Sequence, residues 1–120
     1  MKLIIAPLFA LLAFLPAGCD QELPDTVPPV ISWVYPHDGD TVDPDVYTLV
    51  AVATDDRRMD FVAFFAYTEM LGMVTTAQAD TYRVAVDCRT DTEHVYLLRA
   101  FAVDQAENET SANVRVYVRR

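Results

Sequence analysis

Oxygen-bearing side chains that could bind a ligand occur in three separate segments of the chain. They are Asp25, Asp55, Asp56, Asp104 and Asn108. Carboxylate and amide oxygens are hard ligands, and a set drawn from several loops can bind Ca²⁺. The spacing is not that of a contiguous EF-hand loop, so a calcium site needs a fold that brings the segments together. The alternative is structural: Asp55 and Asp104 cap turns with their side chains, and Asp56 pairs with Arg57 or Arg58.

The remaining nucleophiles and bases form no catalytic pattern. His37 and His94 are far apart in the chain, and Ser32 and Ser111 lie in no nucleophile-elbow motif. A Ser-His or Cys-His pair is therefore unsupported, and a domain this small shows no evident cleft. A second acidic group, between residues 38 and 45, is interpreted as a solvated loop. We expect a protein that is not an enzyme.

Cys19 follows a segment typical of an export signal. Lys2 precedes the apolar run 3–15, which is too short to span a bilayer, and Ala17 and Gly18 are small. The layout resembles a bacterial lipobox, although Pro16 stands where Leu is usual. The resemblance implies that residues 1–18 are a signal peptide and that Cys19 carries a covalent lipid. Ordinary secretion with a free Cys19 thiol, or an uncleaved N-terminal anchor, are the alternatives.

Residues 19–29 are rich in proline and acids, which favours an extended tether between a lipidated Cys19 and a domain at residues 30–120. Cys88 is the second cysteine and then has no intramolecular partner. We expect it to be a small, buried or half-buried residue and expect the domain to depend on a hydrophobic core.

The composition is strongly acidic, with eighteen Asp and Glu against nine Lys and Arg and a net charge of −9. Such a surface repels nucleic acid, so no nucleic acid partner is expected. It favours solubility, cations or a basic partner. An Asp-rich, lysine-poor composition also occurs in salt-adapted or high-GC organisms, so genome bias is the alternative explanation.

Short apolar runs separated by Pro, Gly and Asp predict an all-β protein. Expected strands are 30–35, 46–54, 61–67, 73–76, 82–87, 94–104 and 113–118, with a turn at Glu69 to Gly72. Two of these runs alternate in the same large-then-small order on one face: Tyr47, Leu49, Ala51, Ala53 and Tyr96, Leu98, Ala100, Ala102. About seven antiparallel strands at this spacing predict an immunoglobulin-like β-sandwich in which these two strands face each other. Most of the aromatic residues should be core, whereas an exposed aromatic row would indicate glycan or protein binding.

The chain resembles the bacterial Ig-like modules of secreted and surface proteins. That family opens with Asp-Thr and a Pro-Pro pair, an apolar strand and Pro-x-x-Gly-x-x-Val, as residues 25–42 do. Its Ala-x-Ala-x-Asp occurs at 51–55, and its Ala-x-Ala-x-Asp-x-Ala-Gly-Asn occurs at 100–108 with Glu107 in place of Gly. The resemblance covers residues 25–119.

Taken with the lipobox resemblance, it leads us to expect a non-catalytic, extracytoplasmic interaction or spacer module. The lipid on Cys19 would tie this module to a bacterial membrane, on the periplasmic side or at the cell surface. The expected partner is an envelope or surface protein, or a glycan. The alternative function is a carbohydrate- or calcium-binding accessory domain, and the chain could be a fragment of a larger surface protein.

Overall fold

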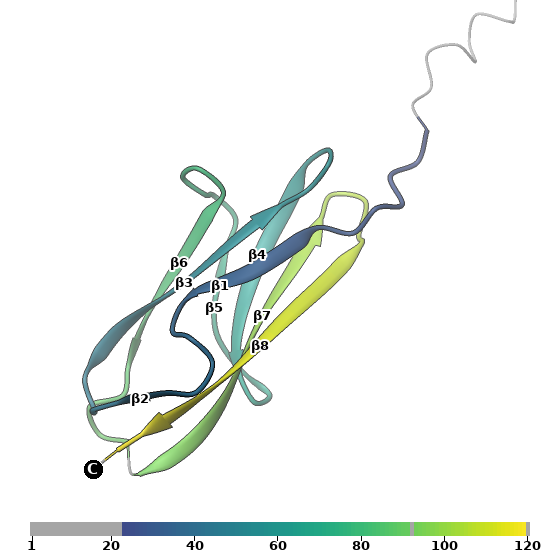
Figure 1. Cartoon of the computed structure of the whole chain (residues 1–120). Helices are drawn as coiled ribbons and strands as arrows, with labels where there is room; N and C mark the ends of the chain where they lie inside the picture. The colour runs from purple at the N-terminus through teal and green to yellow at the C-terminus, as the bar shows by residue number, and fades with distance from the viewer. Residues whose placement is uncertain (1–22, 92, 120) are drawn as a thin grey trace, which may run out of the picture.

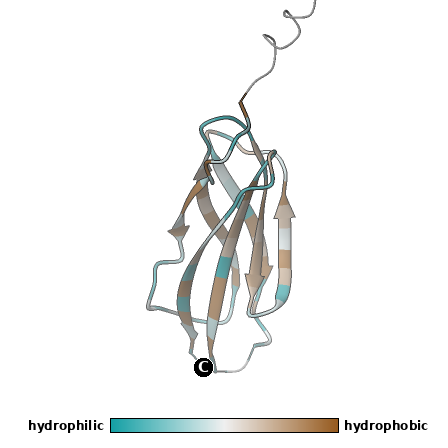
Figure 2. Cartoon of the chain, turned by 90° about the vertical axis from the view of Figure 1, so that its right-hand side faces the viewer, coloured by the Kyte–Doolittle hydropathy of each residue, from teal (hydrophilic) through white to brown (hydrophobic). Residues whose placement is uncertain are grey.

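The computed structural model describes residues 23–91 and 93–119, and all regular structure in them is strand (Figure 1). The eight strands are β1 (Val30–Tyr35), β2 (Asp40–Val42), β3 (Val46–Thr54), β4 (Met59–Ala66), β5 (Glu69–Val74), β6 (Thr81–Asp87), β7 (His94–Asp104) and β8 (Glu109–Val118). Figure 2 shows that the strands are mainly hydrophobic and that the connecting loops are mainly hydrophilic. The all-β prediction is confirmed.

The strands form two sheets packed as a sandwich. One sheet has the order β1-β3-β6, and the other has the order β2-β8-β7-β4-β5. Every pairing is antiparallel except that of β2 with β8, which is parallel. The predicted immunoglobulin-like sandwich is therefore confirmed, with eight strands in place of about seven.

The alternation in β3 and β7 places the predicted residues in the core. Leu49, Ala51 and Ala53 of β3 are buried, as are Leu98, Ala100 and Ala102 of β7. The alanines leave room for rings from other strands: Trp33 and Phe64 meet edge to face with their centroids 5.6 Å apart. Tyr82 lies beside Ala51 in the register of β3 with β6.

The turn predicted for the middle of the chain is wrong. The turn after β4 is at Tyr67 and Thr68, not at Glu69 to Gly72, and Tyr67 itself adopts a φ of 56°. Gly72 lies within β5, where an added Cβ would come within 2.9 Å of a Val84 methyl carbon. The glycine is therefore required by the close approach of β5 to β6 across the sandwich, not by a turn.

The two ends of the sandwich carry different parts of the chain. One end carries the β3–β4 and β7–β8 loops and is joined by the tether, residues 23–29 of the described chain. We call this end the tether pole. The other end carries the β1–β2, β4–β5 and β6–β7 connections and the end of β8; we call it the distal pole (Figure 1).

Candidate functional site

Three carboxylates predicted as calcium ligands come together at the tether pole. One oxygen from each of Asp25, Asp55 and Asp56 lies within 4.8 Å of the others. Asp25 comes from the tether, and the other two residues come from the loop after β3. The fold thus joins two segments that lie thirty residues apart.

Asp104 and Asn108 lie at the same pole but are engaged with each other. Asp104 is fully buried, and its carboxylate accepts hydrogen bonds from the backbone N–H groups of Ala106 and Asn108 and from the Asn108 side chain, each at 2.9 Å. The Asn108 amide also donates to the carbonyl of Asp25 at 2.9 Å. This pair closes the β7–β8 loop and ties the tether to it.

Asp55 has one oxygen in a turn and one without a partner. Its Oδ2 accepts the Arg57 backbone N–H at 3.1 Å, whereas its Oδ1 is buried with no hydrogen-bond partner in the described part of the chain. Among the described residues Asp56 forms no ion pair with Arg57 or Arg58; the Arg57 side chain donates to the Leu23 carbonyl at 2.6 Å. A buried anionic oxygen without a donor has the chemistry of a cation ligand.

The pKa values of Asp25 and Asp104 shift in opposite directions. Burial raises the pKa of Asp25, and the nearby carboxylates of Asp104 and Asp55 raise it further. Burial alone would also raise the pKa of Asp104. The hydrogen bonds from Asn108 and the Ala106 N–H outweigh it and hold that pKa below its ordinary value. Asp104 is stabilised as an anion by protein donors, whereas Asp25 is crowded by other anions.

The distal pole contains a cavity that the sequence did not predict. It lies between the sheets, has a volume of about 250 Å³ and is lined by Tyr35, Tyr47 and Tyr96 together with aliphatic side chains. The expectation of no cleft is therefore wrong. A signal was present in the sequence: Tyr47 and Tyr96 end the inward-facing rows of β3 and β7 at the same pole.

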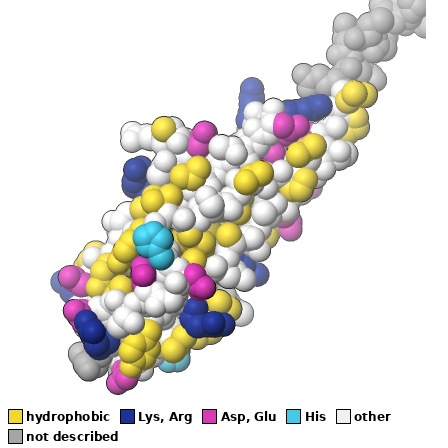
Figure 3. All heavy atoms as spheres, in the orientation of Figure 1, with side chains coloured by type: hydrophobic (Ala, Val, Ile, Leu, Met, Phe, Trp, Pro, Cys, Tyr) yellow, Lys and Arg dark blue, Asp and Glu magenta, His cyan; other side chains and the backbone are white. Residues whose placement is uncertain are grey.

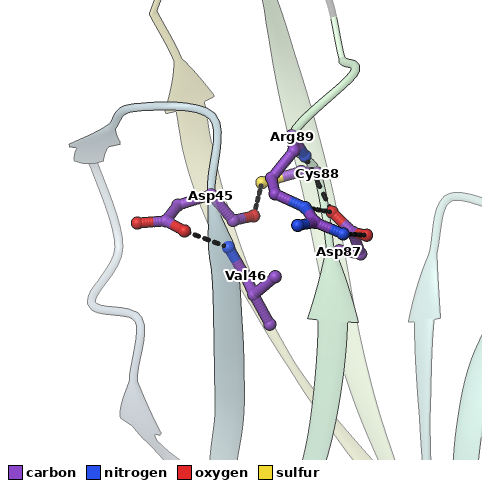
Figure 4. Close-up of polar contacts among 5 residues, drawn as sticks. All are labelled: Asp45, Val46, Asp87, Cys88 and Arg89. Carbon is purple, nitrogen blue, oxygen red and sulfur yellow. Dashed lines mark hydrogen bonds and ion pairs between the residues drawn. The ribbon is translucent and has the colours of Figure 1, made fainter.

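Cys88 lies in the wall of this cavity and is half-buried, as predicted. Its thiol donates to the carbonyl of Asp45 at 3.1 Å (Figure 4), and its backbone N–H donates to the same carbonyl at 2.9 Å. These contacts join the end of β6 to the start of β3. Next to it, Arg89 forms a two-pronged ion pair with Asp87, with nitrogen–oxygen distances of 3.0 and 2.7 Å. The rim of the cavity is thus held by polar contacts.

An apolar surface covers the outer face of the five-stranded sheet. Its outward-facing members on β4, β5 and β7 are Phe61, Phe65, Met70, Met73, Leu97 and Phe101. The Arg99 guanidinium lies 5.3 and 5.9 Å from the ring centroids of Phe65 and Phe101. We call this set the outer apolar face. Of the aromatic residues expected in the core, Phe65 belongs here, and Tyr67 is exposed.

The side of the molecule shown in Figure 3 is also partly hydrophobic. In the orientation of Figure 3, hydrophobic side chains run along the molecule, and charged side chains are frequent toward the two ends. The most exposed large hydrophobic side chain of the three-stranded sheet is that of Val30, with 69% of its surface accessible. Residues 1–22, including the predicted lipidation site Cys19, lie outside the described residues. No helix in residues 23–91 or 93–119 is long and apolar enough to cross a membrane.

Solved structures share this fold. The fibronectin(III)-like modules of Clostridium thermocellum CbhA are 17% identical with a TM-score of 0.66, and the match covers 75% of this chain and 96% of that chain. The endo-β-1,4-mannanase from Thermotoga petrophila is 10% identical with a TM-score of 0.62, covering 78% of this chain and 20% of the mannanase chain. Identities this low show the fold alone.

No curated protein matches the chain. The family model described as bacterial Ig domain matches residues 29–116, which is most of the chain and nearly all of the sandwich. The protein belongs to the bacterial Ig domain family.

Proposed function

We propose that this protein is a non-catalytic interaction and spacer module that acts outside the cytoplasm. The observation that carries the proposal is the placement of the chain: the tether enters at one pole, and β8 ends at the other (Figure 1). A sandwich connected in this way holds whatever follows it at a fixed distance from whatever precedes it. Membership in the bacterial Ig domain family supports an extracellular role.

We further propose that a lipid on Cys19 anchors the module to a bacterial membrane. The support is the sequence alone: a short apolar run, small residues and then cysteine. Two or more acyl chains would hold the protein stably, whereas one would hold it only marginally.

The anchor is tested by the intact mass of the mature protein from the membrane fraction, beside a Cys19→Ser variant. We expect a chain that begins at Cys19 and carries a diacylglyceryl-sized increment, and we expect the increment to be lost in the variant. An unmodified chain in the soluble fraction would contradict the anchor and leave a secreted module.

The proposed contact surface is the outer apolar face, and the proposed partner is an envelope or surface protein. Met70 and Met73 at its edge expose 48% and 51% of their surface, and Arg99 lies between two phenylalanine rings. Apolar side chains grouped on one exposed sheet face mark interaction sites in soluble proteins. A strand added to the free edge of β5 would extend the same surface.

Site-specific photocrosslinking tests this surface. A benzophenone amino acid at position 73 is expected to give one discrete adduct in whole cells, and Phe101→Asp is expected to abolish it. The matched control carries the same group at position 30, on the outer face of the other sheet, where no adduct is expected. Equal adducts from both positions would overturn the proposed surface.

The second candidate function is a Ca²⁺-binding accessory domain. The specific observation is the Asp25, Asp55 and Asp56 cluster with its buried Asp55 oxygen that lacks a donor. Because a ligand of the folded state stabilises it, Ca²⁺ at ~100 times Kd should raise the Tm of EDTA-treated protein by roughly 10–20 °C. Replacing Asp55 and Asp56 by Asn should remove the rise, whereas Asp43→Asn at the distal pole should not. An unchanged Tm excludes the calcium function. A glycan partner remains the other form of this candidate, with the outer apolar face as its surface.

A further inference from the structure

The cavity at the distal pole is large enough for a small ligand. Its volume is about 250 Å³, and an apolar cavity of roughly 150 Å³ already accommodates a benzene ring. Aliphatic side chains from both sheets form its inner wall: Leu49, Leu71, Val86, Leu98, Val116 and Val118. The inner wall therefore fits a single ring or a short hydrocarbon chain.

Tyrosine rings line the cavity nearer its rim. The rings of Tyr35 and Tyr47 have centroids 6.2 Å apart, and Tyr96 lines the cavity from the opposite sheet, with its hydroxyl donating to Asp91 at 2.9 Å. Electron-rich ring faces attract a cation placed against them. The cavity thus combines an apolar interior with an aromatic entrance.

The charged groups of the lining all have the same sign. Glu69, Asp87 and Asp91 line the cavity, and no Lys, Arg or His does so among the described residues. Hydrogen bonds from Arg89 hold the pKa of Asp87 at about 2, so this carboxylate is ionised at neutral pH; Arg89 offsets part of its charge. With a net charge of −9 on the whole chain, the entrance disfavours anions and favours cations.

We propose that this cavity binds a small organic cation, an ammonium group carrying one ring or a short apolar chain. The hydrocarbon part lies between the sheets, and the ammonium group lies at the entrance against the tyrosine rings and the carboxylates. A metal ion does not fit, because the interior offers methyl groups where hard cations need oxygen ligands. The proposal is independent of the module's role as a spacer.

The test uses three probes of nearly the same shape: 2-phenylethylammonium, 2-phenylethanol and phenylacetate. Binding is measured on the full chain by the methyl NMR signals of Leu49, Leu98 and Val118. We expect the cation to bind about three- to tenfold more tightly than the neutral alcohol, the range of a cation–π and charge contribution at a partly exposed site. Phenylacetate should bind most weakly.

A second readout uses the thiol in the cavity wall. In a Cys19→Ser background Cys88 is the only cysteine of the chain, and the ammonium probe should slow its alkylation by iodoacetamide. Glu69→Gln keeps the shape of the cavity and should bring the cation-to-alcohol ratio closer to one, whereas Glu109→Gln, the same charge change at the tether pole, should leave it unchanged. Equal affinity for cation and alcohol, or no shift of the three residues' methyl signals at millimolar probe, would overturn the proposal.

Discussion

The space between the two sheets is filled differently at the two poles of the sandwich. At the tether pole, the alanines of β3 and β7 lie among the rings of Trp33, Phe64 and Tyr82, and a fully buried Asp104 closes the loop above them. At the distal pole, tyrosines and aliphatic side chains leave a cavity of about 250 Å³. The space between the sheets is thus filled by rings packed against alanines toward the tether pole, whereas part of it is left open at the distal pole.

The largest expected difference comes from adding volume at each pole. Ala100 is fully buried and lies beside Phe64 and Ala112 in the sheet register, so Ala100→Leu should cost about 3 kcal/mol of unfolding free energy by overpacking. Val86→Leu adds one methylene at the cavity wall and should change stability by less than about 1 kcal/mol. Denaturant unfolding measures both, and equal costs would contradict the contrast in packing.

Removing one carboxylate charge should lower the Tm more at the tether pole than at the distal pole. Asn at position 104 would place an amide donor against the Asn108 amide donor in a buried site, so Asp104→Asn should lower the Tm by about 8–16 °C. Asp87→Asn removes an exposed ion pair with Arg89 and should lower the Tm by no more than about 4 °C. Thermal unfolding at pH 7 compares the two, and similar losses would argue against the role of the Asp104 network.

The pH dependence of stability should follow the same network. The pKa of Asp104 is lower in the folded protein than its ordinary value, so its stabilising contribution is present above about pH 4 and is lost as the pH falls through the folded pKa. Asp25 acts in the opposite sense. Its pKa is raised in the folded protein, so its contribution to stability is present in acid and is lost as the pH rises through the folded pKa. Stability measured from pH 7 to pH 2 should fall less steeply in Asp104→Asn than in the wild type.

A smaller pair of changes probes the backbone at each pole. Glu107 adopts a φ of 70°, which a residue with a Cβ resists, so Glu107→Gly should stabilise the protein by about 1 kcal/mol. Gly39 at the distal pole has a φ of 90° and no atom within 4 Å of an added Cβ. Gly39→Ala should therefore cost about 1 kcal/mol from strain alone. Opposite signs in chemical denaturation are the expected result, and a loss on both would show that the Glu107 side chain outweighs its strain.

The smallest effect is expected at Cys88. Its thiol donates to the Asp45 carbonyl, but its own backbone N–H already bonds the same oxygen. Cys88→Ser retains a donor and should change stability by less than about 1 kcal/mol, with Cys88→Ala slightly worse. A large loss in both variants would mean that the rim of the cavity depends on the sulfur itself.

The predictable part of the fold is the part in which local pattern and tertiary packing agree. The alternation in 46–54 and 94–104 places Leu49 and Leu98 in the core, and Gly39 of the Pro-x-x-Gly-x-x-Val motif has the positive φ that glycine permits. The predicted turn at Glu69 to Gly72 is wrong because glycine also occurs where two strands approach too closely for a side chain. Nothing local in the sequence indicates that Val84, twelve residues later, occupies the space that a Cβ at Gly72 would need.

The sequence indicates which residues form the candidate site, but not which of them are already held by hydrogen bonds from the protein. The sequence groups Asp25, Asp55 and Asp104 as candidate ligands, and the fold brings them to one pole. The sequence does not indicate that Asn108 donates to Asp104 while one oxygen of Asp55 has no donor, because those contacts depend on the path of two loops. The cavity was missed because empty volume depends on all side chains of both sheets at once.

The parallel pairing of β2 with β8 has a mechanical consequence. Asp40, Thr41 and Val42 pair in register with Val116, Tyr117 and Val118 at the distal pole. When the tether and the end of β8 are pulled apart, β2 and β8 slide in opposite directions, and their hydrogen bonds are loaded together in shear and do not unzip one by one. We therefore expect the pairing of this three-residue strand with β8 to resist a stretching force applied between the tether and the end of β8.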